Sequence, residues 1–168
     1  MLQAKALKLR IILDDQNTLD PIDRRILSAL TENARLSIVE LARRVGLSKT
    51  PVAARVKALE DRGIILGYRA ILSPEKLGLA HVAYVEVRLL DTRQAALQEF
   101  NDAARRVPEI EECYMIAGGF DYLLKVRSRD IVDYRRVLGE TISSLPHVSS
   151  SSTYIAMEAV VEQSYVTL

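Results

Sequence analysis

The apolar residues of this chain change their spacing partway along, and that change constrains the fold more than any other feature. From Leu19 to Gly63 they recur every three or four positions, which is the spacing of amphipathic helices. From about Ala80 they alternate with polar residues, as half-buried strands require. A length of 168 residues leaves room for two small domains. The sequence therefore predicts a helical domain followed by a mixed domain, which is an α+β fold.

Three helices are expected in the first domain, because each has a recognisable start. Asp20 and Pro21 place a capping carboxylate before a proline at the first helical position. The segment Ser37–Glu40 has the spacing of a capping box, in which each side chain satisfies a free backbone N–H group. Ser48 is expected to cap the third helix, which runs to about Arg62.

The second and third helices are joined by only Gly46 and Leu47. A short helix, a tight turn with glycine and a second helix with a basic outer face are typical of a helix-turn-helix DNA-binding motif. The residues expected to contact the bases and phosphates of double-stranded DNA are Arg43, Ser48, Lys49, Thr50, Ala54, Arg55 and Lys57. The alternative is a plain three-helix bundle whose basic residues are only solvated.

The distribution of charge favours the DNA-binding interpretation, although the whole chain has a net charge of only +1. Residues 1–69 carry 13 Lys and Arg against 8 Asp and Glu, a net charge of +5. Residues 70–168 carry 10 against 14, a net charge of −4. Such asymmetry indicates one module for a polyanion and another for a different partner.

The second domain is predicted to have the order strand, helix, strand, strand, helix, strand, which is that of a ferredoxin-like βαββαβ sandwich. Gly118 and Gly119 are expected to form a hairpin turn, and Ser149–Ser152 resembles a linker that precedes a last strand from Thr153 to Val161. The expected divisions of the chain are an N-terminal arm at 1–18, a winged-helix or helix-turn-helix domain at 19–66, an extended linker at 67–78, and the ferredoxin-like domain at 79–168.

Both helices of that sandwich are expected on one face of its sheet, which leaves the other face open. The apolar residues expected on the open face are Val82, Tyr84, Tyr154, Ala156 and Val160. A second copy of the same sheet is the simplest cover for such a face, so we expect a homodimer or a larger homo-oligomer.

Other kinds of chemistry find little support in the sequence. Cys113 is the single cysteine, which excludes an internal disulfide, and it is expected to be a small buried apolar residue. His81 and His147 have no second histidine or cysteine at metal-ligand spacing, so a structural role is expected for both. We therefore expect no catalytic residues, no metal and no cofactor. No apolar stretch is long enough for a membrane-spanning helix, and a reducing cytoplasm fits the cysteine count.

Four segments carry a resemblance to a known family: Asp20–Leu27, Glu40–Ser48, Arg55–Glu60 and Gly118–Lys125. Together they resemble the leucine-responsive regulatory protein/asparagine-synthetase regulator (Lrp/AsnC) family over about residues 19–162. The segments 112–113, 134–141 and 153–154 also resemble its leucine-responsive members. The resemblance implies a bacterial transcription regulator, associated with the nucleoid, that is not an enzyme. It implies that the first domain binds DNA and that the second binds a free amino acid and builds dimers that assemble into octamers or larger rings.

The resemblance also places the amino-acid effector between dimers. The positions that it assigns to effector binding are Met115, Gly118, Gly119, Asp121, Tyr154, Ile155 and Ala156.

A free amino acid is a zwitterion, and the chemistry of the glycine hairpin agrees with such a ligand. Gly118 and Gly119 allow backbone N–H groups to approach a carboxylate, and Asp121 supplies an acceptor for an ammonium group. The alternatives are a plain turn and a solvated carboxylate. Ile155 and Met115 suit an aliphatic side chain, which favours a leucine-type effector. A local regulator that responds to another amino acid, such as proline, is the alternative, and a ligand-binding oligomer or small enzyme without DNA binding is a further one.

Overall fold

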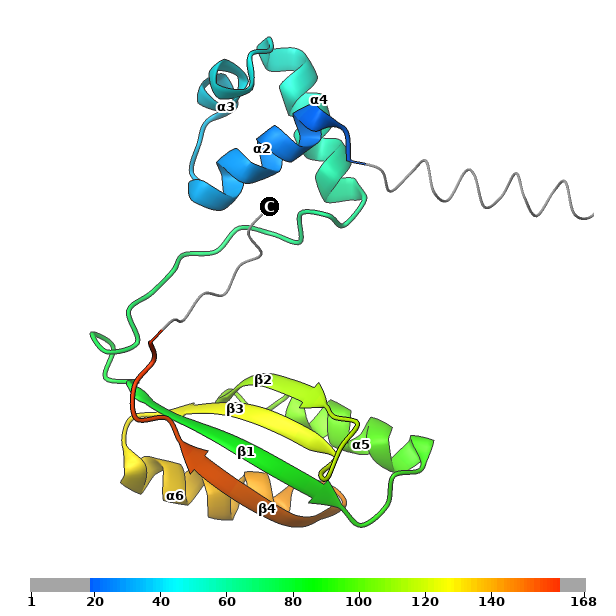
Figure 1. Cartoon of the computed structure of the whole chain (residues 1–168), viewed down its shortest axis with the longest axis vertical. Helices are drawn as coiled ribbons and strands as arrows, with labels where there is room; N and C mark the ends of the chain where they lie inside the picture. The colour runs from blue at the N-terminus through cyan, green and yellow to red at the C-terminus, as the bar shows by residue number, and fades with distance from the viewer. Residues whose placement is uncertain (1–18, 161–168) are drawn as a thin grey trace, which may run out of the picture. The chain divides into compact units, whose positions relative to one another are not determined.

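The computed structural model describes residues 19–160, which form two compact units (Figure 1). The first unit ends at Ile71 and the second begins at Leu72. This division falls inside the segment 67–78 that the sequence predicts as a linker. The expected arm at 1–18 and residues 161–168 of the expected second domain lie outside the described residues.

The first unit consists of three helices: α2 (Pro21–Glu32), α3 (Ile38–Val45) and α4 (Lys49–Asp61). One carboxylate oxygen of Asp20 accepts hydrogen bonds from the N–H groups of Ile22 and Asp23, each with an N···O distance of 2.8 Å. The capping box is present, because the Ser37 hydroxyl binds the Glu40 N–H and the Glu40 carboxylate binds the Ser37 N–H. Local sequence therefore predicts where α2 and α3 begin.

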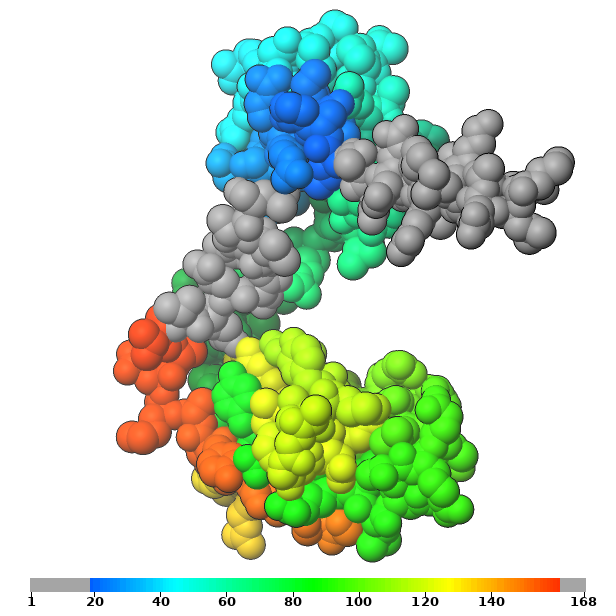
Figure 2. Space-filling view, turned by 45° about the vertical axis from the view of Figure 1, so that its right-hand side comes forward, coloured from blue at the N-terminus to red at the C-terminus, as the bar shows by residue number. Residues whose placement is uncertain are grey.

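The core of this unit is built from the stripes that helical spacing predicts. Ile26 of α2, Leu41 of α3 and Val52 of α4 are completely buried, and the three helices pack as one body in the space-filling view (blue to cyan in Figure 2). The residues of this cluster are Ile26, Leu27, Ala29, Leu41, Ala42, Val45, Val52, Val56 and Leu59. Within residues 19–71 the structure has no strand, so the wing of the expected winged-helix domain has no counterpart in this part of the chain.

The second unit has the predicted ferredoxin-like order. Its elements are β1 (His81–Leu89), α5 (Gln94–Ala104), β2 (Ile110–Met115), β3 (Tyr122–Ser128), α6 (Ile131–Glu140), a short 3-10 turn (Ile142–Ser144) and β4 (Val148–Ile155). The strands form one antiparallel sheet in the order β2-β3-β1-β4. Both helices lie on the same face of this sheet (Figure 1), so the prediction of a one-sided sandwich is confirmed.

The core of the second unit lies between the sheet and the two helices. Val85 and Leu124 point into it from the central strands, and Phe100 and Val137 from α5 and α6, all completely buried. The rings of Phe100 and Tyr122 stack with their centroids 4.3 Å apart. Among residues 19–160 no helix covers the other face of the sheet.

The last strand differs from the sequence-based prediction. Ser149–Ser152 belongs to β4 and is no linker, and β4 ends at Ile155 instead of running on to 161. Serine has little preference for strands, but this segment pairs with β1 in register, so that Ser152 lies opposite Glu86 and Ser150 opposite Arg88. Pairing with a partner strand that is distant in sequence therefore outweighs the local composition.

The hairpin predicted at Gly118 and Gly119 is present, because β2 and β3 pair as consecutive antiparallel strands and both glycines lie in the loop between them. Neither glycine has a positive φ, and the Ile116 N–H closes the loop by donating to the Asp121 carbonyl at 2.9 Å. The prediction for Cys113 is wrong: it is exposed and not buried, because β2 lies at the edge of the sheet.

Candidate nucleic-acid interface and effector site

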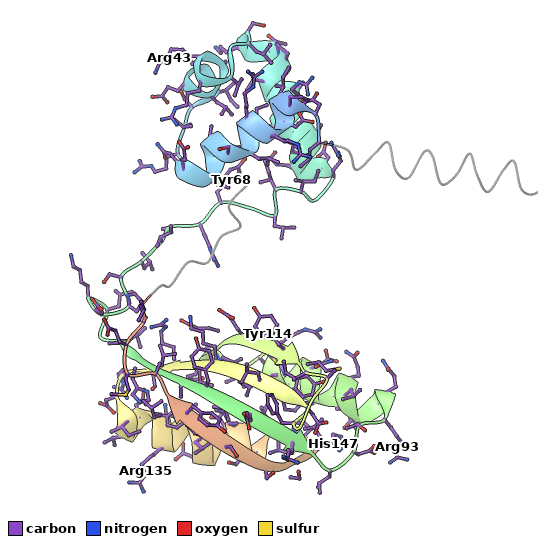
Figure 3. All side chains as sticks on the ribbon, in the orientation of Figure 1. Arg43, Tyr68, Arg93, Tyr114, Arg135 and His147 are labelled. Carbon is purple, nitrogen blue, oxygen red and sulfur yellow. The ribbon has the colours of Figure 1, made fainter. Side chains whose placement is uncertain are left out.

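The outer face of α4 is available for contact with DNA. Ser48, Lys49, Thr50, Ala54 and Lys57 are all exposed, whereas Val52, Val56 and Leu59 on the inner face are buried. Arg43 is also exposed and points away from the body of the first unit from α3 (Figure 3). Six of the seven residues that the sequence assigns to DNA contact thus lie on the surface of this unit, on or next to α4.

Arg55 is the seventh residue, and the structure places it differently. Its Nη1 atom lies 2.5 Å from Oδ2 of Asp20 and 2.7 Å from Oδ1 of Asp23. These partners stand at the start of α2, 35 and 32 positions earlier in the sequence. One nitrogen of the guanidinium is therefore held against the start of α2, although the side chain is one third exposed. Sequence periodicity has no signal that could reveal a pairing over such a distance.

Lys57 also has a partner, but an exposed one. Its Nζ lies 2.9 Å from Oδ2 of Asp61, one turn further along α4, and both side chains are largely exposed. The Asp61 carboxylate raises the pKa of the Lys57 ammonium. An exposed ion pair of this kind contributes little free energy, so Lys57 can leave Asp61 and bind a DNA phosphate with little loss of stability.

Asp121 is anchored at one end of the sheet. Its Oδ2 atom accepts a hydrogen bond from the Leu89 N–H at 2.7 Å, and its own N–H donates to the Val87 carbonyl at 2.9 Å. These bonds fix the loop after β2 against the last residues of β1. Met115 at the end of β2 and Gly118 and Gly119 in the loop are exposed near it in sequence, and a side-chain carbon at Gly119 would meet nothing within 4 Å.

The other predicted effector residues lie at the opposite end of β1. Ile155 pairs with Ala83, Tyr154 pairs with Tyr84, and the Ala156 N–H donates to the Val82 carbonyl at 2.9 Å. Six residues separate Ala83 from Leu89, which at roughly 3.3 Å per residue amounts to about 20 Å of strand. Within one chain the structure therefore does not bring Asp121 and the end of β4 into one pocket.

The open face of the sheet combines aromatic rings with a buried cation. Tyr84 and Tyr154 lie directly opposite each other in the β1–β4 ladder and are 39% and 56% exposed. On the neighbouring strand Lys125 is buried, with its Nζ 3.3 Å from a Glu111 carboxylate oxygen and 3.8 Å from one of Glu112. The face thus carries exposed apolar surface beside a compensated charge, which suits a protein interface.

The structure gives both histidines structural partners. His81 Nδ1 lies 2.8 Å from the Ser128 hydroxyl, and His147 Nε2 lies 2.8 Å from a Glu99 carboxylate oxygen. Over residues 19–160 no three His, Cys, Asp or Glu side chains gather in a group that could hold a metal ion. In that same stretch no helix has the length and apolar character needed to cross a bilayer.

Two hollows lie outside these sites. An apolar groove of about 750 Å³ runs between the end of α2 and the segment 64–71 of the first unit. A smaller cavity of about 330 Å³ lies between α5 and β2, with Cys113 in its lining. None of the predicted effector residues lines either hollow.

Sequence profiles identify both units. The first matches "winged helix-turn-helix DNA-binding" at residues 19–65, and the second matches "Lrp/AsnC ligand binding domain" at residues 82–166. This chain belongs to the Lrp/AsnC family. It is therefore a DNA-binding transcription regulator, as the helix-turn-helix and the charge asymmetry predict, and its second domain is of the kind that binds amino acids.

Relatives and solved structures agree with this assignment. The chain is 66% identical to a "proline dehydrogenase transcriptional activator" of Rhodobacter capsulatus, over 89% of this chain and 97% of that protein. It is 46% identical to the leucine-responsive regulatory protein of Escherichia coli strain K12, over 84% and 87%. A Neisseria meningitidis transcriptional regulator solved in complex with L-Met superposes with a TM-score of 0.82 at 34% identity, over 89% and 96%.

Proposed function

We propose that this regulator is a local activator of a proline dehydrogenase gene and that its effector is proline. The observation that carries this proposal is the identity to relatives of that name, 66% for the Rhodobacter capsulatus protein and 60% for the Rhizobium radiobacter protein. Identity to the leucine-responsive proteins of Haemophilus influenzae and Escherichia coli strain K12 is lower, at 43% and 46%. Leucine is the second candidate effector, favoured by the aliphatic side chains of Met115 and Ile155.

DNA binding is assigned to the exposed side of α4 and its flank. Thr50 and Ala54 face outward on α4 and suit contact with base edges, because small side chains let the helix approach the floor of the major groove. Arg43, Lys49 and Lys57 provide cations for phosphates, and the Ser48 hydroxyl, which makes no capping bond to α4, provides a donor. The chain acts on bacterial chromosomal DNA in the cytoplasm.

The effector site is assigned to a junction between copies of this chain. Asp121 lies in the loop that contains Gly118 and Gly119, at one end of β1. By the rise per residue of a strand, about 20 Å of β1 separates this loop from Tyr154, Ile155 and Ala156. One bound amino acid is too small to bridge that distance. If all of these residues contact the effector, the loop of one copy must therefore meet the end of β4 of another.

Regulation then follows from assembly. The open face with Tyr84 and Tyr154 forms a homodimer, and dimers associate into octamers or larger rings whose contacts enclose the effector. An amino acid that binds one assembly better than another shifts the population toward it, and its differential affinity sets the size of that shift. DNA bound by several helix-turn-helix units at once responds to the change in assembly.

Calorimetric titration of the purified full-length protein with proline, leucine, methionine and alanine tests the effector assignment. Proline is expected to bind with the highest affinity, and sedimentation velocity is expected to show a change in assembly size with proline alone. Binding of leucine in preference to proline would replace the proposed effector with the second candidate. Binding of none of the four would contradict an amino-acid sensor of this type.

A further inference from the structure

Arg55 joins two helices of the DNA-binding unit through a pair of carboxylates. It lies on α4 next to the buried stripe of Val52 and Val56, with its side chain 33% exposed. Its Nη1 atom contacts Asp20 at 2.5 Å and Asp23 at 2.7 Å. The Asp23 side chain is only 10% exposed, and a buried carboxylate of this kind requires a charged or hydrogen-bonding partner.

Asp20 has two functions in this cluster. Its Oδ1 atom caps α2 by accepting the N–H groups of Ile22 and Asp23, while its Oδ2 atom binds Arg55. These backbone bonds, together with Arg55, hold the pKa of the Asp20 carboxyl below its usual value. The start of α2 and the middle of α4 are therefore fastened by one network of charge-assisted hydrogen bonds.

We propose that Arg55 is a positioning residue, which fixes the orientation of α4 against α2 and so the face that α4 presents to DNA, without touching DNA itself. The inference rests on the DNA-binding function and goes beyond it, because it removes one cation from the contact surface. The two contacts on Nη1 hold the side chain against the start of α2, so Arg55 could turn outward to a phosphate only by leaving the buried Asp23 carboxylate. Lys57, two residues further on, can bind a phosphate by breaking only its ion pair with the exposed Asp61.

Positioning and contact have different signatures in DNA affinity. Loss of a phosphate contact weakens binding to every sequence and flattens the salt dependence by about one unit. Loss of correct helix orientation weakens the binding of a specific sequence, because base contacts depend on geometry, and leaves the number of phosphate contacts nearly unchanged.

The experiment measures affinity against salt concentration for two duplexes of equal length. One is a sequence that the wild-type chain selects from a random pool, and the other is a random sequence. The variants are Arg55→Met, Asp23→Asn and the double variant, with Lys57→Ala as the matched loss of an exposed cation on the same helix. Circular dichroism confirms the fold of each, and the double variant, which leaves no unpaired buried charge, covers the case in which Arg55→Met fails to fold.

Arg55→Met and the double variant are expected to lose at least tenfold in affinity for the selected duplex, with an unchanged salt slope and little change for the random duplex. Asp23→Asn is expected to do the same, although it makes the unit more positive and on charge alone would tighten binding. Lys57→Ala is expected to weaken both duplexes and to flatten the slope.

Either of two results would overturn the proposal. A slope flattened by about one unit in Arg55→Met, equal to that of Lys57→Ala, would make Arg55 a phosphate contact. Unchanged affinity of the folded variants for both duplexes would leave Arg55 with a role in stability alone. If the wild-type chain selects no sequence from the pool and does not bind the random duplex, the DNA-binding function itself fails, which is a separate result.

Discussion

The carboxylate of Asp121 accepts the backbone N–H of Leu89, with 2.7 Å between Oδ2 and N. Together with the bond from the Asp121 N–H to the Val87 carbonyl, it ties the loop between β2 and β3 to the end of β1. Over residues 19–160 the Oδ1 atom of Asp121 has no hydrogen-bond partner, so one oxygen holds the loop while the other is available to an ammonium group. The same side chain thus serves the fold and, in our proposal, the effector.

The two roles of Asp121 separate in two substitutions. Asp121→Asn keeps an acceptor for the Leu89 N–H but loses the negative charge, so we expect unchanged thermal stability and no response of the assembly to proline. Asp121→Ala also leaves that N–H unsatisfied, which costs about 1–3 kcal/mol of the free energy of unfolding. Thermal melting and sedimentation with and without proline measure both effects, with the exposed Asp102→Asn as control. A proline response retained by Asp121→Asn would contradict a role for the charge.

A site shared between copies predicts complementation. Asp121→Asn disables the loop, and Ile155→Asp disables the end of β4, so each variant alone is expected to lose proline binding. Mixed assemblies contain junctions in which the intact loop of one variant meets the intact strand of the other, and calorimetry should show partial recovery of proline binding. A site contained in one chain predicts no recovery, because every chain then carries a defect.

The open face of the sheet is expected to hold the dimer together. Tyr84→Asp puts a charge in the middle of that face, and burying it without a partner is costly. We therefore expect the variant to sediment as a folded monomer at concentrations where the wild-type chain is a dimer or larger. Val132→Asp is the control, because Val132 is 74% exposed on α6, on the helix side of the sheet. Equal assembly of the two variants would place the interface elsewhere.

The capping box of α3 makes a prediction about acid stability. Hydrogen bonds from the Ser37 hydroxyl and backbone N–H hold the pKa of Glu40 below its usual value of 4.5. Because the folded pKa lies below the unfolded one, this stabilisation is present at neutral pH and is lost as the pH falls below about 4.5. Thermal melting between pH 7 and pH 3 should show a smaller loss of stability in Glu40→Gln than in the wild type. Ser37→Ala is expected to cost about 0.5–2 kcal/mol at neutral pH.

Asp61 competes with DNA for Lys57. Removing this carboxylate in Asp61→Ala frees the ammonium and takes a negative charge from the α4 face, so affinity for any duplex is expected to rise. The control is Glu99→Ala, which removes an exposed carboxylate from α5 of the other unit. Equal effects of the two variants on DNA affinity at several salt concentrations would contradict this prediction. They would show that affinity depends on net charge alone and not on the pairing of Lys57 with Asp61.

Much of the first unit could be predicted because its signals are local. Asp20, Ser37 and Gly46 bound their helices through contacts within a few residues, and the spacing of Val52, Val56 and Leu59 follows from the helical repeat alone. The element order of the second unit was accessible for the same reason, since alternation and helical spacing are properties of short windows.

The errors lie where a distant partner decides the outcome. Ser149–Ser152 is a strand only because β1 supplies its hydrogen bonds, and Cys113 is exposed because the strand order puts β2 at an edge.

By itself, then, the sequence determined the helix limits of the first unit, the order of helices and strands in the second unit, and the family to which both belong. Only the tertiary structure decided that Arg55 turns toward Asp20 and Asp23, and that Asp121 and Ile155 stand at opposite ends of β1. The physical reason is that periodicity and capping act over a few residues, whereas ion pairing and strand register join residues tens of positions apart.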